Sequence, residues 1–496
     1  MVFSSPVFLF LFLPWVLLLY FGLRVPLRNL VLLLASLFFY AWGETYLVLL
    51  MIASIFVNWG LGLWIGASDE QGRRRLGLVV GVVFNLGLLV VFKYADWLWA
   101  VLGHGLAAIG LVAEPFAPLG SLLEGELSRQ VFLDARGGIR LPIGVSFFTF
   151  QALSYVIDVY RRNVDTQRSV VSFATYLSLF PQLIAGPIVR YHDVAQQIDN
   201  RKVTLDGFSY GVRRFVIGLG KKMLVANTVA RIADQVFDLP AAELTPAVAW
   251  LGILGYTLQI YFDFSGYSDM AIGLGHMFGF RFLENFNYPY ISRSITEFWR
   301  RWHISLSSWF RDYLYIPLGG SRAGAGRTYR NLVIVFLLCG LWHGASFAFV
   351  VWGLYHGFFL VIERMGVQRW MDARHSLVRH VYTLLVVMVG WVFFRADTLG
   401  YALSYIGAMF GVAAGDPAMH PVALYADPTF IVAAIAGAIG SMPWLPRVRD
   451  WIAANVRGPA HAGLEVATLL GIALVLLASA FELSAGVYNP FIYFRF

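Results

Sequence analysis

Long apolar stretches recur along this chain from its first residues to its last. A helix needs about 20 mostly apolar residues to cross a bilayer, and shorter helices re-enter the membrane where neighbours cover their polar groups. The pattern predicts an all-α polytopic membrane protein with about a dozen transmembrane or re-entrant helices. The candidate helices lie at residues 7–23, 29–42, 46–65, 76–92, 97–112, 141–159, 173–189, 211–236, 247–262, 332–361, 380–394, 401–412, 429–442 and 464–481.

One connection between these stretches is long. Residues 113–140 mix proline, glycine and charges of both signs, which is typical of a connecting loop. The sequence shows no repeat with a period of about 20–50 residues and no low-complexity segment. We therefore predict a single membrane-embedded domain, with N-terminal helices at 1–112, the loop at 113–140, a core at 141–363 and C-terminal helices at 364–496.

Composition supports the interpretation as a membrane protein and limits the classes of partner that we expect. The chain is 59% hydrophobic and 13% charged, with a mean hydropathy of +0.68, whereas soluble domains carry about 25% charged residues. The net charge of +8 does not indicate nucleic acid, because the cations lie in short loops beside apolar stretches and form no basic domain. We expect membrane lipids as partners, no nucleic acid, and no metal, since a single cysteine excludes thiolate zinc sites.

Basic residues beside the first stretches predict the orientation of the chain. Arg24 and Arg28 follow the first stretch, and Arg73, Arg74 and Arg75 follow the third. Basic loops tend to stay in the cytoplasm, so we place the N-terminus outside it. The first stretch lacks a basic region before it and is followed at once by others, which favours a retained helix over a cleaved signal.

A histidine lies inside the apolar stretch at 332–363. His343 is surrounded by small residues that would let another helix or a substrate approach closely. Its side chain can accept a proton near neutral pH, so His343 is a candidate general base. The alternative is a structural histidine bonded to a facing carbonyl, and position alone does not decide between them.

Two other polar residues share this stretch. His356 lies 13 residues after His343, about 220° around an unbroken helix, so the two histidines cannot share a face unless the helix breaks. We therefore interpret His356 as structural. Cys339 is one turn before His343 and is interpreted as packing, because it has no cationic neighbour to activate a thiolate.

Residues 292–320 predict an amphipathic helix at the membrane surface or over a cavity. Ser294 and Glu297 form a capping box that starts the helix. Aromatic residues then recur at helical spacing over 295–313, and the opposite side carries Arg300 and Arg311. His303 falls about 80° from the centre of the apolar stripe. A histidine at that border can face inward toward a site or lie at the interface with its ring turned to water.

Residues 261–269 (YFDFSGYSD) place four polar side chains at the end of an apolar stretch. Asp263, Ser265, Ser268 and Asp269 are too many for lipid contact, so they indicate a water-filled cavity or mutual hydrogen bonding. Helix capping at the membrane boundary is the alternative. The motifs of soluble hydrolases, zinc proteases and ATP-binding loops are absent from the sequence.

These motifs resemble those of the membrane-bound O-acyltransferase family. The resemblance rests on YFDFSGYSD followed by MAIGLG, on ITEFWRRWHISLSSWFRDYLYIPLGG and on LWHG at 341–344. It extends from MVFSSPVFLFLFLP at the start, through LPIGVSFFTFQALSYVIDVYR and LFPQLIAGPIVR, to NPFIYF near the end. Within the family, the chain is most similar to the bacterial alginate O-acetylase branch.

The resemblance implies a fold and a set of site residues. The expected fold is a ring of tilted helices around a central funnel where acyl donor and acceptor meet, with interfacial amphipathic helices beside it. The family's essential histidine matches His343 and its upstream polar partner matches His303, so both are expected to be catalytic and the core at 141–363 to carry the site. The candidates for substrate binding are Asp263, Ser265, Asp269, Arg300 and Arg311.

The resemblance also implies an activity and its partners. Similar subunits take acetyl from a cytoplasmic donor, expected to be acetyl-CoA with no bound cofactor, and pass it to SGNH-like periplasmic acetyltransferase subunits. Those partners O-acetylate an exopolysaccharide, so a multi-pass protein of the bacterial inner membrane is expected. His343 would activate an acceptor hydroxyl, and His303 would orient the donor or stabilise the oxyanion. An acyl-enzyme on Cys339 stays open as an alternative.

Polymer identity is open at this point. Alginate is favoured by overall likeness, but related subunits acetylate cellulose or peptidoglycan, and a more distant branch D-alanylates teichoic acids. A transporter for the polysaccharide or its lipid carrier is a second hypothesis from another class. Inverted repeats and paired broken helices would indicate a transporter, and the sequence shows neither.

Overall fold

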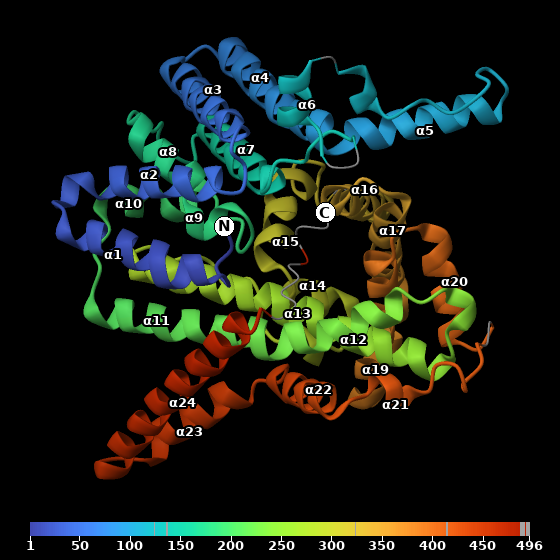
Figure 1. The fold of residues 1–496 in the computed structure, drawn as a ribbon. Coiled ribbons are helices and arrows are strands. Elements are labelled where there is room, and N and C mark those ends of the chain that lie inside the picture. The colour runs from blue at the N-terminus through green and yellow to red at the C-terminus, as the bar shows by residue number, and fades with distance from the viewer. Residues whose placement is uncertain (124, 135–136, 323, 413–414, 487–491, 493–496) are drawn as a thin grey trace. The chain divides into compact units, whose positions relative to one another are not determined.

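The computed structural model describes the chain apart from residues 124, 135–136, 323, 413–414, 487–491 and 493–496 (Figure 1). The described residues form helices and no strand, with one isolated bridge between Leu133 and Ile139. Six described helices are long and apolar enough to cross a membrane, and a bent pair at Pro428–Gly440 and Trp444–Ile452 would make a seventh span. The predicted all-α polytopic membrane fold is confirmed. The six are Val48–Ala67, Gln71–Ala108, Pro246–Met277, Phe347–Asp372, Ser376–Arg395 and Pro459–Ser484.

The chain divides into two compact units, which we describe separately. The first comprises Met1–Val2, Val7–Thr204 and Gly279–Phe282. Its helices are α1 (Leu13–Gly22), α2 (Arg28–Ala41), α3 (Val48–Ala67), α4 (Gln71–Leu89), α5 (Ala95–Ala108), α6 (Glu126–Phe132), α7 (Val145–Arg161), α8 (Val170–Ser178), α9 (Phe180–Leu183) and α10 (Tyr191–Asn200), with π-turns η1 (Phe8–Phe12) and η3 (Val90–Tyr94).

Helices α4 and α5 of the first unit form one helix of 38 residues through the π-turn η3. The expectation of separate helices at 76–92 and 97–112 is therefore wrong. The intervening sequence, VVFKYADW, contains neither glycine nor proline. Because nothing there breaks the backbone hydrogen bonding, the helix continues.

Buried polar side chains join the helices of the first unit. Asn58 on α3 and Asn85 on α4 exchange side-chain hydrogen bonds of 3.2 and 2.6 Å. The buried guanidinium of Arg74 on α4 donates to the carbonyls of Ile65 and Val159 at 2.7 and 3.0 Å. Polar groups of this kind need partners in an apolar medium, and these bonds supply them between helices that sequence separates.

The second unit comprises Phe3–Pro6, Leu205–Phe278 and Leu283–Phe496. Its helices are α11 (Leu205–Gly220), α12 (Asn227–Phe237), α13 (Pro246–Met277), α14 (Ile295–Arg301), α15 (Ile304–Phe310), α16 (Ala325–His343), α17 (Phe347–Ile362), α18 (Gln368–Asp372), α19 (Ser376–Arg395), α20 (Leu399–Met409), α21 (Val422–Tyr425), α22 (Pro428–Gly440), α23 (Trp444–Asn455) and α24 (Pro459–Ser484), with π-turns η5 (Lys221–Ala226), η8 (Arg311–Tyr315) and η9 (Glu363–Val367).

Helix α13 is 32 residues long and packs closely against α11. A Cβ on Gly218 would lie 2.5 Å from the carbonyl oxygen of Gly266, and one on Gly211 would lie 2.6 Å from that of Gly273. The two backbones therefore approach at glycines, as small residues allow in membrane helix pairs. The capping interpretation of residues 261–269 is wrong, because they lie within α13 and not at its end.

Two other predicted helices are broken in the structure. The stretch 332–361 is a helical hairpin in which α16 and α17 meet at Gly340 and Gly353, whose Cα atoms an added Cβ would approach to 3.1–3.2 Å. The predicted helix at 295–313 is two short helices, α14 and α15, separated at Trp302 and His303. Aromatic periodicity persists across that break, so the sequence pattern did not indicate it.

Candidate active site

His343 is the last residue of α16, and only 4% of it is exposed. The helix ends there because Gly344 is extended and α17 starts after Ser346, whose hydroxyl accepts a hydrogen bond from Phe349 N at 3.5 Å. A Cβ on Gly344 would lie 2.2 Å from the Phe349 ring. The turn therefore needs glycine at 344, and it ends α16 with the imidazole inside the protein.

Aromatic rings surround the His343 imidazole. Its centroid lies 4.9 Å from that of Trp342, and 5.0 Å from those of Trp352 and Phe394. A small cavity of about 10 Å³ touches this ring, enough for about one water molecule. A larger acyl group would enter only if these side chains moved. The cavity is lined by Ile260, Phe264, Trp302, His343, Trp352, Trp391, Phe394 and Ile492.

His303 is fully buried at the break between α14 and α15. Its backbone is left-handed, with φ 43° and ψ 55°, a conformation that costs a non-glycine residue about 1–3 kcal/mol and is often found at functional sites. The ring lies 4.7 Å from Phe264 and 6.0 Å from Trp342, centroid to centroid. Trp342 therefore contacts the rings of both His303 and His343, although His303 does not line the small cavity.

Asn285 holds the His303 ring. The Oδ1 atom of Asn285 lies 3.2 Å from His303 Nδ1, and it accepts hydrogen bonds from Ser305 N and Oγ at 3.2 and 2.8 Å. Its Nδ2 donates to Ser268 Oγ on α13 at 3.1 Å. An amide oxygen only accepts hydrogen bonds, so His303 Nδ1 carries the hydrogen and Nε2 carries the lone pair.

The other ring nitrogen of His303 is an acceptor aimed into the protein. Nε2 is buried, with no hydrogen-bond partner among the residues described. His303 lies outside the helices that are long and apolar enough to cross the membrane. Its burial lowers the pKa of the imidazole to about 3. The ring is therefore neutral at physiological pH, and Nε2 can accept a hydrogen bond from an N–H or O–H group of a ligand.

The start of α14 is fixed by three side chains. Ser294 Oγ accepts from Glu297 N at 3.0 Å, as the capping box predicts, while the Glu297 carboxylate accepts from the preceding Arg293 N at 2.9 Å. Glu363, which is 2% exposed, accepts from the backbone N–H groups of Ile295 and Thr296 at 2.7 and 3.0 Å. A carboxylate at these unsatisfied N–H groups stabilises a helix start, and it holds α14 in place before the break at His303.

The acidic candidates of α13 are ion-paired. Asp263 lies 2.6 Å from Lys222 Nζ, and its Oδ2 accepts from Ile492 N at 2.9 Å. Asp269 lies 2.7 Å from both Arg214 and Lys221. The predicted mutual hydrogen bonding among the polar groups of residues 261–269 is therefore wrong for both carboxylates, because cations from α11 and η5 hold them.

The remaining predicted site residues lie apart from the cavity. Ser265 is buried, while Arg300 is exposed and the exposed Arg311 pairs with its neighbour Asp312 at 2.7 Å. Asp263, Asp269, Ser265 and these two arginines do not line the cavity at His343. Their role in substrate binding stays a prediction.

His356 and Cys339 keep the structural interpretation in the folded chain. His356 is fully buried, and its Nδ1 accepts a hydrogen bond from the indole of Trp299 at 3.3 Å. The argument that the two histidines lie on different faces assumed an unbroken helix, and the break at Gly344 removes that assumption. The two rings are nevertheless separated by Trp352, whose ring lies 5.0 Å from that of His343 and 5.1 Å from that of His356. Cys339 is buried and does not line the cavity.

Sequence reasoning missed several residues that build this site. Asn285 stands in ENFNYPY, an asparagine-rich loop directly before the capping box, and that proximity was the available signal. Lys222 belongs to the GLGKK segment, where two lysines in an apolar stretch indicate buried acidic partners. Trp352 and Trp391 carried no signal, because tryptophan is common throughout an apolar chain.

The fold and the site define a polytopic helical membrane enzyme with a buried histidine at a helix end. The model of the membrane-bound O-acyltransferase family matches residues 137–397, and the chain belongs to that family. It is therefore an O-acyltransferase.

Several relatives align with the chain over half to all of its length. It is 44% identical, over 100% of both chains, to a protein of Pseudomonas putida named probable alginate O-acetylase AlgI. It is 36% identical to the peptidoglycan O-acetyltransferase of Helicobacter pylori, covering 83% of this chain and 80% of that one. It is 26% identical to the teichoic acid D-alanyltransferase of Bacillus subtilis, over 50% of this chain and 65% of that one.

Proposed function

We propose that this enzyme relays acetyl groups from acetyl-CoA, on the cytoplasmic side of the inner membrane, toward the O-acetylation of an exopolysaccharide. The observation that carries the proposal is the 44% identity over the full length of a chain named as a probable alginate O-acetylase. Alginate is accordingly the proposed polymer. Periplasmic SGNH-like acetyltransferase subunits are the proposed recipients of the acetyl group, and the N-terminus is proposed to be periplasmic.

His343 is the proposed general base. Its ring accepts the proton of the acceptor hydroxyl while that oxygen attacks the thioester carbonyl, which forms the C–O bond and breaks the C–S bond. The departing thiolate then takes the proton back from the imidazolium, so no net proton is gained or lost. The rings of Trp342, Trp352 and Phe394 around His343 exclude bulk water, which limits hydrolysis of the donor.

His303 is the proposed donor-orienting residue. A neutral ring with its hydrogen on Nδ1, donated to Asn285, offers Nε2 as an acceptor. Such a nitrogen can bind an N–H or O–H group of the donor, but it has no hydrogen to offer a developing oxyanion. Of the two roles considered for His303, the arrangement supports orientation of the donor.

The decisive experiment is a transfer assay with radiolabelled acetyl-CoA, in membranes that contain this chain with and without the periplasmic subunit. We expect label in the polysaccharide only when both proteins are present, and none with the His343→Ala variant at equal abundance. Polymer that becomes acetylated without label from acetyl-CoA would overturn the donor assignment.

The polymer has a second candidate, supported by the 36% identity to a peptidoglycan O-acetyltransferase. The same assay separates the two when alginate and peptidoglycan are recovered from one reaction and counted individually. Label in peptidoglycan alone would replace alginate in the proposal and leave the chemistry at His343 unchanged.

A further inference from the structure

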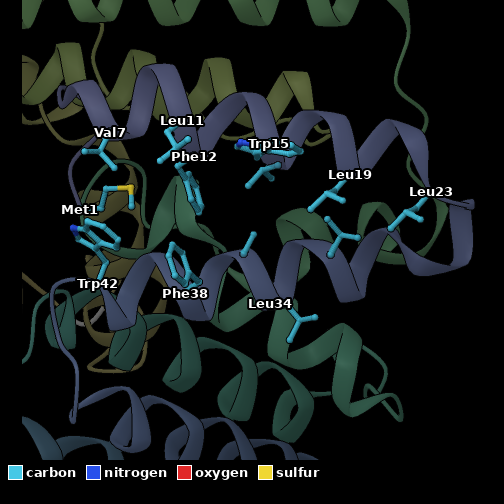
Figure 2. A pocket seen from close by; sticks show the side chains of 13 residues that line it. Met1, Val7, Leu11, Phe12, Trp15, Leu19, Leu23, Leu34, Phe38 and Trp42 are labelled. Carbon is cyan, nitrogen blue, oxygen red and sulfur yellow. The ribbon is translucent and has the colours of Figure 1, made fainter.

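An apolar groove runs between α1 and α2 of the first unit (Figure 2), and no residue that lines the cavity at His343 lines this groove. Its volume is about 650 Å³, within the range of about 300–1,000 Å³ typical of ligand pockets. Figure 2 shows side chains from both helices pointing into it, with Met1 and Trp42 at one end and Leu23 at the other. It is lined by Met1, Val7, Leu11, Phe12, Trp15, Val16, Leu19, Leu23, Val31, Leu34, Ala35, Phe38 and Trp42.

Arginines gather where the groove ends at Leu23. Arg24 directly follows Leu23 in the chain and is exposed. The Arg28 guanidinium lies 5.0 Å from the centre of the Tyr20 ring, and that of Arg201 lies 5.6 Å from the same ring. The Tyr20 ring of α1 thus contacts two cations, Arg28 at the start of α2 and Arg201 directly after α10, while Arg24 lies in the turn that joins α1 to α2.

Two of these cations have no acidic partner among the described residues. Arg24 and Arg28 form no ion pair there, and Nε of Arg28 is buried without a hydrogen-bond partner. Arg201 donates to the neutral oxygens Tyr20 Oη and Asn29 Oδ1 at 3.0 and 2.7 Å. Like charges gathered in this way repel one another, and a bound anion would offset that cost.

We propose that this groove binds an anionic phospholipid of the bilayer, with one acyl chain along α1 and α2 and the phosphate at Arg24 and Arg28. The apolar lining and the cationic end together match a ligand that is apolar along its length and anionic at its head. A soluble anion would not use the lining, and a neutral lipid would not use the arginines. Basic residues beside a membrane helix attract the anionic lipids of the cytoplasmic leaflet, which is where the positive-inside rule places this turn.

The test measures binding of phosphatidylglycerol and of phosphatidylcholine to the full purified chain in detergent by native mass spectrometry. Two variants probe the two parts of the site: Arg24→Gln/Arg28→Gln removes the cations, and Ala35→Trp fills the groove. Arg73→Gln/Arg75→Gln is the matched control, because it removes two exposed arginines elsewhere in the same unit.

We expect tighter binding of phosphatidylglycerol than of phosphatidylcholine, and about tenfold weaker phosphatidylglycerol binding in the Arg24/Arg28 variant. Ala35→Trp should weaken both lipids, and the control should change neither. Equal losses in the Arg24/Arg28 variant and the control would overturn the proposal, as would unchanged binding to Ala35→Trp. Preferential binding of a polyprenyl phosphate, or recovery of the chain with a second copy or another protein's helix in the groove, would also overturn it.

Discussion

His303 lies at the interruption between helices α14 and α15, where its ring is close to Asn285. The amide of Asn285 bonds His303, Ser305 and Ser268, so one residue fixes the ring of the histidine and ties it to α13. Such a support sets which ring nitrogen is available, in the way that partners of catalytic histidines usually do. At the residue scale, the position of the His303 ring therefore depends on Asn285.

Loss of the His343 imidazole should abolish acyl transfer. General-base catalysis contributes about 10²–10⁴-fold in rate, so we expect His343→Ala to lower turnover by at least about 100-fold while the protein inserts normally. Turnover is measured by label transfer in membranes, and abundance by immunoblot. His356→Gln is the control, since His356 does not line the cavity. A folded His343→Ala variant that still transfers label would remove His343 from the mechanism.

A double-mutant cycle tests whether Asn285 acts through His303. His303→Ala and Asn285→Ala should each lower turnover at saturating donor by about 100-fold, because misplacement of about 1 Å has that effect. The double variant should be no slower than either single variant, since residues that act as a unit are not additive. Asn285→Asp keeps an oxygen acceptor and should retain more activity than Asn285→Ala. Additive losses would show that the two side chains act independently.

His192 on α10 should make stability depend on pH. Hydrogen bonds to Asp158 at 2.8 Å and to Asp193 at 3.2 Å raise the pKa of His192 to about 9. Because the folded pKa lies above the unfolded value of about 6.5, this stabilisation is complete below about pH 6.5 and is lost as the pH rises through 9. The melting temperature in detergent should therefore fall between pH 7 and pH 10, and fall less in His192→Gln. Parallel curves for both proteins would contradict this assignment.

Helix pairs in this protein approach at glycines, and breaks in helices place the histidines. Gly218 and Gly266 bring α11 and α13 together, so that Asp269 on α13 reaches Arg214 and Lys221. The turn at Gly344 ends α16 at His343. At the element scale, the same residue type thus serves close packing in one place and helix termination in another.

A methyl group at the α11–α13 contact should destabilise the fold. The Cβ of Gly218→Ala would lie 2.5 Å from the Gly266 carbonyl oxygen, and overpacking of this kind costs about 1–3 kcal/mol. Gly87→Ala on α4 is the matched control, because nothing lies within 4 Å of its Cβ and alanine favours helix. Thermal unfolding in detergent should show a lower melting temperature for Gly218→Ala and an unchanged or higher one for Gly87→Ala. Equal melting temperatures would show that α11 and α13 move apart to accommodate the methyl group with little loss of stability.

At the scale of the whole molecule, the orientation of the chain in the membrane decides from which side of the membrane the acyl donor enters. Helix α3 is apolar and long enough to cross the membrane, so we expect the turns before and after it to lie on opposite sides. From the arginines that follow α1 and α3, we predict that the second of these turns lies in the cytoplasm.

Cysteine labelling tests that orientation, because Cys339 is the single natural cysteine. In a Cys339→Ser background that remains active, Tyr46→Cys should react with an impermeant thiol reagent in intact spheroplasts. Asp69→Cys, at an exposed position after α3, should react only after permeabilisation. The reverse pattern would place the N-terminus in the cytoplasm and invert the proposed direction of transfer.

Much of this protein followed from its sequence alone. Apolar stretches determined the all-α membrane fold, because a bilayer accepts few other structures. The capping box determined where α14 begins, and buried histidines stood out because ionisable groups are costly in membranes. These are local signals, carried by residues that adjoin in the chain.

The tertiary structure decided the rest. The break at His303, the tautomer set by Asn285 and the pairing of Asp263 with Lys222 each depend on groups that the sequence separates. The hydrophobic periodicity likewise did not indicate the continuous helix through residues 90–94 or the hairpin at Gly344. Periodicity reports which face of a segment is apolar, whereas a helix ends or continues according to the hydrogen bonds and close contacts offered by distant residues.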